Sequence, residues 1–275
     1  MAKDLYSRIV EIDEASLRTI AEVLEVRGRH PQQVAIRDAY LHGLGDLTEQ
    51  RVLDVGCGTG VITRELARRV GPTGRVTGVD PSPVLIEVAE RLRDDDDLDW
   101  SSFGVQDGRA LPFPDGSFDL TTAITVLCHV PERAEVLREL ARVTRPGGTV
   151  LIMDGEYAAN QVEHPDRALT ARIVDAWRAS VVDDPYLMRH IIPLIAATGL
   201  EPGSVNGHIH VEAGRVDEAT SFIWQWALFA ARQALGAEAV DEREARRWTE
   251  QLRAMNERAE LFGSVSYVSV VARRH

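Results

Sequence analysis

Lysine is almost absent from this sequence, since Lys3 is the only one and arginine supplies every other permanently basic side chain. Several kinds of active site depend on a lysine held inside the fold. They include the pyridoxal Schiff base, the P-loop phosphate clamp and the Tyr-x-x-x-Lys hydride-transfer site. The interior of this chain offers no residue for any of these sites.

Cysteine is scarce as well. Cys57 and Cys128 are too few for a disulfide framework, and their spacing fits no zinc site. Both lie where an apolar strand is expected to run into a loop, so we predict reduced thiols that act as small apolar side chains. This pattern indicates a reducing compartment.

The sequence also lacks long apolar runs and clustered positive charge. Its longest apolar stretches, 191–197 and 222–231, are too short to cross a bilayer, and the N-terminus has no signal-peptide pattern. The formal net charge is −12, with arginines interleaved among acidic residues, whereas phosphate binding needs clustered basic side chains. We therefore expect a cytoplasmic protein, monomeric or homodimeric, with a small-molecule substrate and no nucleic-acid or membrane partner.

What the sequence contains is typical of one α/β domain with additions. A chain of 275 residues, 44% hydrophobic and 27% charged, can bury a full core. We predict a helical segment over residues 1–46, where apolar side chains recur at helical spacing. They form two stripes, Leu5, Ile9 and Ile12, followed by Ile20, Val23 and Leu24.

From Arg51 onward, short apolar segments alternate with amphipathic ones. Ser82 can cap one predicted helix and Pro83 suits its first turn, while the Pro146-Gly147-Gly148 turn leads into a strand. Sustained alternation of this kind implies a parallel sheet covered by helices on both faces. The predicted strands are 52–55, 75–79, a third that ends with residues 103–105, 118–126 and 149–153, and the predicted helices are 59–70, 83–92 and 131–143.

After Asp154 the alternation pauses, and two helical segments interrupt the sheet, each followed by one further strand. We interpret them as insertions that supply a lid, in preference to a second independent domain. The predicted fold is α/β, a Rossmann-like, doubly wound and mostly parallel seven-stranded sheet over residues 47–275, with residues 1–46 as a cap. The insertions lie at about 160–199 and 216–260, and the strands that follow them at 205–211 and 265–272.

The strongest chemical signal follows the first predicted strand, in the sequence Val52-Leu53-Asp54-Val55-Gly56-Cys57-Gly58-Thr59-Gly60. Alternate glycines let the backbone turn tightly and approach a ligand without interference from Cβ atoms. The next helix points free N–H groups at the same place, and in open α/β sheets ligands bind at this carboxyl-end crevice. A dinucleotide fingerprint would need a third glycine where Val61 stands.

The Asp-x-Gly-x-Gly-x-Gly loop resembles motif I of the class I S-adenosylmethionine-dependent methyltransferases, and four further motifs follow in that family's order. The resemblance covers about residues 47–155 and is to the ubiquinone/menaquinone-biosynthesis-like (type-11) branch. It implies S-adenosyl-L-methionine as the cofactor and a small organic molecule as the methyl acceptor. The four motifs are Val76-Thr77-Gly78-Val79-Asp80-Pro81-Ser82, Gln106-Asp107-Gly108, and residues 111–119 and 140–149.

The same resemblance implies where the cofactor lies. Asp80 and Pro81 would take the ribose, and Asp107 with Gly108 the adenine. Thr125 and Val126, at the end of the fourth strand, would line the inner side of the cofactor. The methionine portion would be surrounded by the first loop, that is by Asp54, Gly56, Cys57, Gly58 and Gly60, with Cys57 acting as a small packing residue there.

Methyl transfer from a sulfonium is an in-line displacement on an activated donor, so holding the acceptor in line in a dry site supplies much of the catalysis. A general base matters only for an acceptor that carries a proton. His129 is the candidate base because it follows the fourth strand, with a packing role at a helix entry as the alternative. Glu156 and Tyr157, after the fifth strand, are candidates to orient an amine or hydroxyl of the acceptor.

No catalytic metal ion is expected. Metal-dependent catechol methyltransferases need a carboxylate soon after the fourth strand, where this chain has Leu127-Cys128-His129. His208 and His210 share one face of a predicted strand. Without a third ligand at a suitable spacing, we interpret them as a packing or hydrogen-bonding pair.

Aromatic side chains crowd the second insertion, as in Phe222, Trp224, Trp226 and Phe229. Most of them are expected to form the core of the lid, and a face that covers the crevice would suit an aromatic or lipophilic acceptor. Two other functions stay open, a cyclisation carried out on the same cofactor-binding frame and a nicotinamide-dependent oxidoreductase. For the oxidoreductase, the sequence lacks both the third glycine and an internal lysine. A non-catalytic scaffold would be expected to lose some of the motifs, and none is lost.

Overall fold

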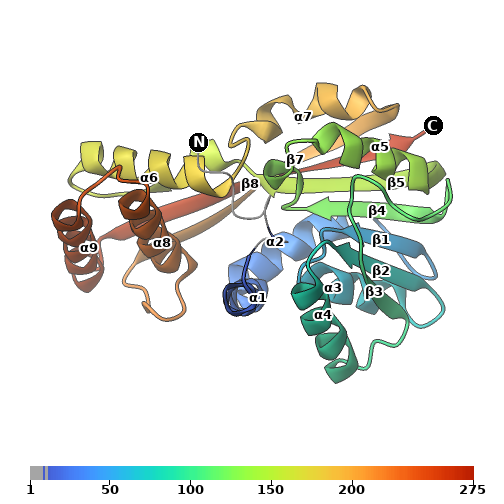
Figure 1. Ribbon diagram of the computed structural model, residues 1–275, viewed down its shortest axis with the longest axis horizontal. Coiled ribbons are helices and arrows are strands. Elements are labelled where there is room, and N and C mark those ends of the chain that lie inside the picture. Colours follow the sequence, from blue (N-terminus) through green and yellow to red (C-terminus); the bar gives the residue numbers. More distant parts are fainter. Residues whose placement is uncertain (1–8, 10–11) are drawn as a thin grey trace.

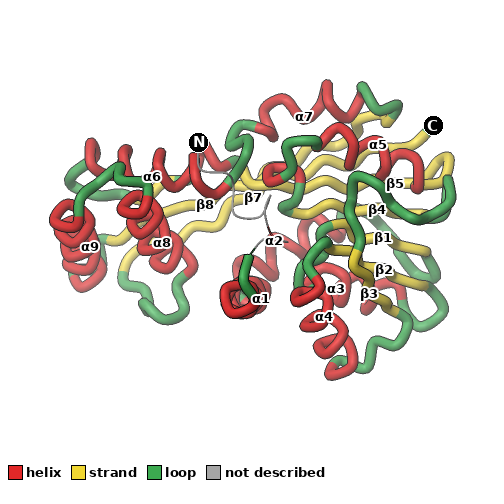
Figure 2. Tube along the Cα trace, viewed as in Figure 1, coloured by secondary structure: helices red, strands yellow, loops and turns green. Residues whose placement is uncertain are grey.

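A computed structural model describes residue 9 and residues 12–275, and its centre is one twisted sheet flanked by helices, as Figure 1 and Figure 2 show. Leu5 of the first predicted stripe lies outside the described residues. The strands are β1 (Arg51–Val55), β2 (Arg75–Asp80), β3 (Ser101–Val105), β4 (Phe118–Ile124), β5 (Thr144–Gly155), β6 (Gln161–Val162), β7 (Leu200–Gly214) and β8 (Leu261–Arg274).

The strands stand in the order β3-β2-β1-β4-β5-β8, with β7 on the far edge of β8 and the short β6 on the same edge of β8 as β5. The first five are parallel, and β8 is antiparallel to each of its neighbours. The order reverses between β1 and β4, so the loops that follow these two strands diverge and open a crevice between them. This arrangement confirms the predicted Rossmann-like class, and β6 is an additional strand of two residues.

Helices cover both faces of the sheet. One apolar cluster joins α2 and α3 to one face, and a second joins α5 and α7 to the other. The helices are α1 (Glu14–Arg29), α2 (Pro31–His42), α3 (Val61–Val70), α4 (Pro83–Asp95), α5 (Arg133–Val143), α6 (Arg167–Val181), α7 (Leu187–Ala196), α8 (Phe222–Gly236) and α9 (Glu242–Glu257). Ser82 caps α4 as predicted, its side chain accepting a hydrogen bond from the Leu85 N–H.

The N-terminal helices pack on the sheet domain at two places. Leu17 and Ala21 of α1 form a small apolar cluster with Leu85 and Val88 of α4. On α2, Tyr40 belongs to the main core, together with Ile36 and Leu41. The predicted helical character of this segment is therefore confirmed from Glu14 to His42, with a break before Pro31.

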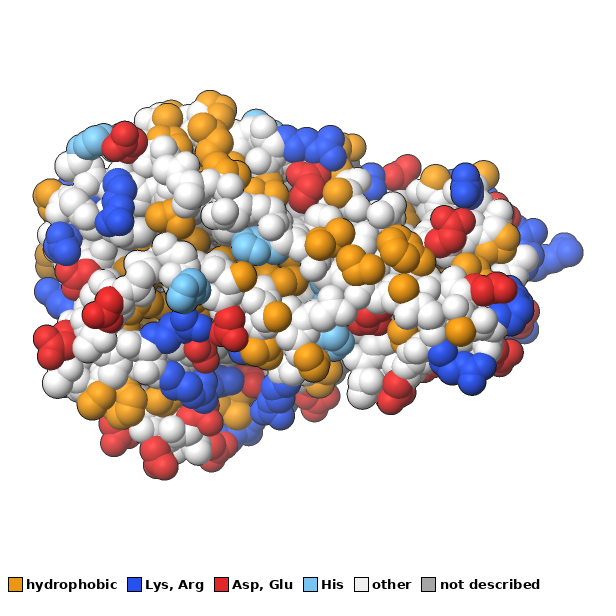
Figure 3. All heavy atoms as spheres, turned by 180° about the vertical axis from the view of Figure 1, so that it is seen from behind, with side chains coloured by type: hydrophobic (Ala, Val, Ile, Leu, Met, Phe, Trp, Pro, Cys, Tyr) orange, Lys and Arg blue, Asp and Glu red, His pale blue; other side chains and the backbone are white. Residues whose placement is uncertain are grey.

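Helices α6, α8 and α9 pack together as a lobe on the long β7–β8 ribbon, at the left of Figure 1. Trp224 and Trp248 are almost completely buried there, and the Trp248 Nε1–H donates to the Thr170 hydroxyl at 2.9 Å. The apolar core of the lobe is continuous with that of the sheet. Seen from behind, the lobe is the narrower end of the molecule, and acidic and basic side chains are interspersed over both parts (Figure 3).

Several boundaries differ from those predicted. Strands β7 and β8 extend well beyond 205–211 and 265–272, because they pair with each other from Leu200 to Gly214 and continue past the end of the sheet. Much of β7 is exposed and polar, which hides its strand character in the sequence. Strand β4 ends at Ile124, two residues early, because Thr125 adopts a positive φ of 55° that no strand accommodates.

Among the described residues, no helix combines the length and the apolar character that crossing a membrane requires.

The junction between the lobe and the sheet leads to a first prediction. A Cβ on Gly263 would overlap the side chain of Ile223 and lie 3.2 Å from the Gln161 carbonyl, whereas a Cβ on Gly207 would meet nothing within 4 Å. We expect Gly263→Ala to lower the free energy of unfolding by about 1–3 kcal/mol through overpacking. Gly207→Ala on the neighbouring strand is the matched control and should be neutral or slightly stabilising. Urea denaturation checks both, and equal stability of the two variants would contradict the packing argument.

Candidate functional site

The glycine loop between β1 and α3 turns sharply at the carboxyl end of the sheet. Gly56, Gly58 and Gly60 have φ values of +72°, +53° and +79°, a region that residues with a Cβ rarely adopt. A Cβ on Gly56 would also overlap Val126, and one on Gly60 would lie 2.7 Å from the Phe103 ring. Backbone conformation and close packing both require these glycines, which confirms the tight turn expected from the sequence.

Asp80, at the end of β2, holds this loop in place. Its Oδ2 accepts a hydrogen bond from the Gly58 N–H at 3.0 Å, and its Oδ1 accepts one from the Ser82 N–H at 2.9 Å. Burial raises the pKa of Asp80, and these two hydrogen bonds oppose that shift. A carboxylate has about four acceptor positions, so about half remain for the two ribose hydroxyls predicted to bind here.

Asp54 lies beneath the loop and is almost completely buried. Its two oxygens accept hydrogen bonds from the hydroxyls of Thr63 on α3 and Thr122 on β4, each at 2.7 Å. Burial raises the pKa of Asp54 to about 6, with the two hydroxyl hydrogen bonds acting in the opposite direction. The carboxylate therefore joins β1, β4 and α3, and its predicted contact with the methionine portion of the cofactor stays a prediction.

Thr125 and Val126 face the same loop from the end of β4. Thr125 is a β-branched residue at positive φ, an uncommon and strained conformation, and its N–H donates to the Met153 carbonyl at 2.7 Å. Val126 occupies the space beside Gly56. Cys57 is buried in the loop, and burial raises the pKa of its thiol well above the usual range, so it stays protonated and unreactive.

The predicted adenine-binding residues follow β3, at the expected end of the sheet. Asp107 is exposed and forms an ion pair with Arg109 at 2.7 Å, which lowers the pKa of the carboxyl. A Cβ on Gly108 would lie 2.7 Å from the Val55 side chain, so this position requires glycine for packing. Pro81 stands between Asp80 and the start of α4, as the motif implies. The contacts of these residues with a cofactor are untested.

Helix α1, part of the segment predicted as a cap, contacts the glycine loop through side chains that the sequence did not single out. Glu25 accepts a hydrogen bond from the Thr59 hydroxyl at 2.7 Å and forms an ion pair with Arg64 at 2.9 Å. The Leu24 side chain lies 3.2 Å from where a Cβ on Gly58 would stand. The helical stripe marks Leu24 as apolar, but no local pattern shows that it faces this loop.

A second group of titratable side chains meets at the ends of β4 and β5. Asp154 is fully buried, and its oxygens accept hydrogen bonds from the N–H groups of Cys128 at 3.1 Å and Gly155 at 2.9 Å. Burial raises the pKa of Asp154, and the charge of the nearby His129 opposes that shift. The Cys128 thiol donates to the Tyr157 hydroxyl at 3.7 Å. Asp154, which the sequence marked as a strand end, thus lies close to His129 and bonds to the backbone of Cys128, and Tyr157 joins this group through its contact with Cys128.

Glu156 lies apart from this group. Its carboxylate forms an ion pair with Arg189 of α7 at 2.8 Å, and Arg189 also stacks over the Tyr186 ring. Tyr157 turns the other way, with its ring 5.9 Å from that of Trp177 in the lobe. Of the two residues predicted to orient an acceptor, Tyr157 therefore contacts the segment after β4 that carries His129, whereas Glu156 pairs with α7.

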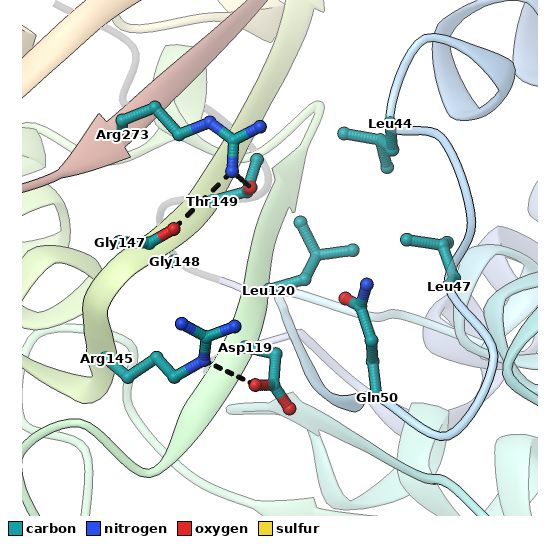
Figure 4. Close-up of a pocket in the computed structure, with 10 residues that line it drawn as sticks. All are labelled: Leu44, Leu47, Gln50, Asp119, Leu120, Arg145, Gly147, Gly148, Thr149 and Arg273. Atoms are coloured by element: carbon teal, nitrogen blue, oxygen red, sulfur yellow. Dashed lines mark hydrogen bonds and ion pairs between the residues drawn. The ribbon is translucent and has the colours of Figure 1, made fainter.

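Two surface cavities lie away from the crevice. One, of about 180 Å³, is at the opposite edge of the sheet, where Arg145 pairs with Asp119 and Arg273 contacts Thr149, as Figure 4 shows. The other, of about 290 Å³, runs along α6 on the lobe. Neither includes a residue of the glycine loop or of the group around Asp154.

The raised pKa of Asp54 predicts a dependence of stability on pH. A carboxyl that titrates at about 6 when folded and near 3.8 otherwise favours the folded state below pH 4 and loses that contribution as the pH rises through 6. The loss is about 3 kcal/mol for a fully buried group. The asparagine in Asp54→Asn does not titrate, so this pH dependence is absent from the variant. Between pH 4 and pH 7 its free energy of unfolding should therefore rise by about 3 kcal/mol relative to that of the wild type. Urea denaturation at both pH values measures the gain, and an unchanged difference would contradict the shift.

The comparisons with known proteins agree with this geometry. Residues 53–152 match the family described as "Methyltransferase domain". The methyltransferase GfsG of Streptomyces halstedii is 46% identical over 105 residues, which are 38% of this chain and 37% of that protein. A demethylmenaquinone methyltransferase of Lactococcus lactis is 39% identical over 114 residues, 42% of this chain and 45% of that protein. The chain thus spans less than half the length of these curated relatives.

Among solved structures, the cyclase SpnF is similar over 90% of this chain and 84% of its own, with a TM-score of 0.56 and 20% identity. That likeness concerns the fold alone. The matched residues 53–152 run from the middle of β1 through the glycine loop, Asp80, Asp107 and His129 to β5. The chain therefore carries a class I S-adenosylmethionine-dependent methyltransferase domain of the ubiquinone/menaquinone-biosynthesis-like branch.

Proposed function

We propose that this protein transfers the methyl group of S-adenosyl-L-methionine to a small aromatic or lipophilic acceptor, by in-line displacement without a catalytic metal ion. The observation that carries the proposal is the loop of alternate glycines tied to Asp80 at the carboxyl end of the parallel sheet. This loop stands beside a second group of polar side chains from β4 and β5. One group suits the cofactor and the other the acceptor.

The residues present fit the cofactor. The backbone at Gly56 and Gly58 is free of Cβ atoms, and Asp80 retains acceptor capacity for neighbouring hydroxyls. The cofactor supplies an activated methyl group, so the protein need only hold the acceptor in line and exclude water. On this proposal, helix α1 over the loop and the predicted lid would supply the apolar cover.

His129 is the proposed general base for an acceptor that carries a proton. It lies directly after β4, it is largely buried, and Asp154 lies close enough to interact with its charge. A neighbouring carboxylate stabilises the imidazolium formed when the ring takes a proton. Asp154 itself is fully buried and accepts backbone N–H bonds on both oxygens. It is therefore poorly placed to coordinate a divalent ion, which supports a metal-independent step.

The proposed acceptor site continues from Tyr157 into the lobe. The Tyr157 ring faces Trp177, and the Trp177 ring packs edge-on against Trp226 at 5.2 Å. Both indole rings are more than nine-tenths buried, and neither Nε1–H has a hydrogen-bond partner among the described residues. An unpaired buried donor costs roughly 1–3 kcal/mol. An acceptor that presents an oxygen to these rings would remove that cost, which favours an oxygen-bearing aromatic or lipophilic compound.

A product assay tests the proposal and the role of His129 together. Incubation with S-adenosylmethionine and a panel of phenols and lipophilic quinols should add one methyl group to a product, read by mass spectrometry. A product of unchanged mass would indicate cyclisation or another rearrangement instead. His129→Ala should lower the single-turnover rate by roughly 10²–10⁴-fold while cofactor affinity, measured by calorimetry, stays the same. A normal rate in a variant with a lower Tm would assign His129 to packing.

The unpaired indoles lead to a separate prediction. Trp177→Phe keeps an aromatic ring and removes the N–H donor, so the KM for the acceptor should rise about 5–10-fold, the worth of one hydrogen bond. Cofactor affinity should not change, and the Tm should fall less than in a variant that also loses a hydrogen bond, because loss of the unpaired donor offsets part of the cost of the cavity. Acceptor kinetics and a melting curve measure both effects.

Trp248→Phe is the matched control for that substitution. It removes an indole N–H that does have a partner, the Thr170 hydroxyl, inside the same lobe. This variant should melt at a lower temperature and keep the wild-type KM. If Trp177→Phe also left KM unchanged, the indole would belong to the core of the lobe alone.

A further inference from the structure

Three side chains with metal-ligand chemistry meet between the N-terminal helices and β7. His30 lies in the turn between α1 and α2, and His210 and Glu212 lie on β7. The Nε2 atoms of His210 and His30 lie 2.7 Å and 3.4 Å from the same oxygen, Oε1 of Glu212. The possible ligand atoms of all three residues lie within 4.8 Å of one another.

The local chain conformation sets this convergence. Residues two apart on a strand point to the same face, so His210 and Glu212 stand side by side on β7. His30 is the N-cap of α2, with an extended backbone, and its Nδ1 accepts the Gln32 N–H, which leaves Nε2 to face Glu212. Gln32 also pairs with the backbone of Val211 through both ends of its side-chain amide, at 2.7 Å and 3.0 Å.

Further polar side chains support these three. The Gln33 amide lies 3.2 Å from Nδ1 of His210 and 3.1 Å from the Tyr267 hydroxyl, so a single buried amide orients the imidazole. On the other side, Glu212 accepts hydrogen bonds from the Ser221 hydroxyl and from the Phe222 N–H, at the start of α8. His210 is therefore oriented by a residue of α2, and Glu212 by residues at the start of α8.

The charges in this cluster do not balance. Glu212 is buried, and its partners within the described residues are a hydroxyl, a backbone N–H and two imidazoles, with no arginine among them. The carboxylate thus lies buried beside two imidazoles, with a hydroxyl and a backbone N–H as its other hydrogen-bond donors.

We propose that His30, His210 and Glu212 bind a divalent transition-metal ion, of the class of zinc, which fastens the turn between α1 and α2 to β7. Two imidazole nitrogens and a carboxylate oxygen are a known ligand set for such ions. In a tetrahedral site the ligand atoms lie about 3.3 Å apart, so the 3.4 Å pair already fits and the 2.7 Å pair must open slightly.

The side chains that orient the three ligands are compatible with a bound ion. With the amide of Gln33 turned over, its oxygen can accept from Nδ1–H of His210, which holds Nε2 free for the metal. None of the three ligands belongs to the loops that follow β1 to β4, where the cofactor and the candidate base lie. The ion would therefore have a structural role, holding the N-terminal helices to β7. It takes no part in the displacement step, and its binding does not depend on the proposed reaction.

Cobalt(II) binding to the full chain, after treatment with a chelator, tests this proposal. We expect one equivalent of cobalt(II) to give the intense visible absorption of a low-coordinate site, and zinc(II) to displace it and raise the Tm. His30→Asn removes one ligand yet keeps a residue type that caps helices well, so α2 is retained. Its metal affinity should fall by more than about 10-fold, because mutation of a residue that only orients a ligand already lowers metal affinity by about 10-fold or more.

His208→Asn is the matched control, because His208 lies on the same face of β7 and contacts Ser269 instead of the cluster. This variant should bind cobalt(II) as wild type does. If His30→Asn folds poorly, Gln33→Leu serves in its place and should weaken binding about 10–100-fold. A wild-type protein that gives only the spectrum of hydrated cobalt(II), or equal affinities in wild type and His30→Asn, would overturn the site. These readouts do not use methyl transfer, so failure of the site and failure of the proposed function are distinguishable.

Discussion

The hydrogen bonds from Gly58 and Ser82 to the carboxylate of Asp80 are the constraint on which the rest of the crevice depends. Pairing of β1 with β2 brings two strand ends together, but it does not fix the loops beyond them. One buried carboxylate does so, by satisfying N–H groups of both loops at once. This contact sets the direction in which α3 and α4 leave the sheet, and with it the shape of the surface on which α1 packs.

The N-terminal helices are joined to the rest of the molecule at two places. Near the cofactor loop, Glu25 holds Thr59 and Arg64, and at the far edge Gln32 hydrogen-bonds to the backbone of β7. The position of these helices therefore depends on contacts between segments far apart in sequence, such as Gln32 and Val211, which are 179 residues apart. The cap is part of the site's environment and not an appendage to it.

Much of the fold and of the cofactor loop could be predicted from the sequence, because both rest on local patterns. Alternating apolar segments identified the seven long strands, and the alternate glycines marked a turn that their positive φ values require. The ends of elements were less predictable. The early end of β4 follows from the conformation of Thr125, and the length of β7 follows from pairing with β8 outside the sheet, neither of which leaves a mark in the local sequence.

The sequence by itself determined the class of fold, the position of the cofactor loop and the order of the motifs around it. Only the tertiary structure decided which polar side chains act together. Asp154 and Tyr157 both meet the Cys128–His129 segment because β4 and β5 end at the same edge, whereas Glu156, one residue from Tyr157, forms an ion pair with Arg189 instead. His210 has its carboxylate two residues away but its second imidazole 180 positions earlier in the chain, at His30. Local spacing fixes the direction of a side chain, but its partners come from distant segments, whose approach is decided by burial of the whole core.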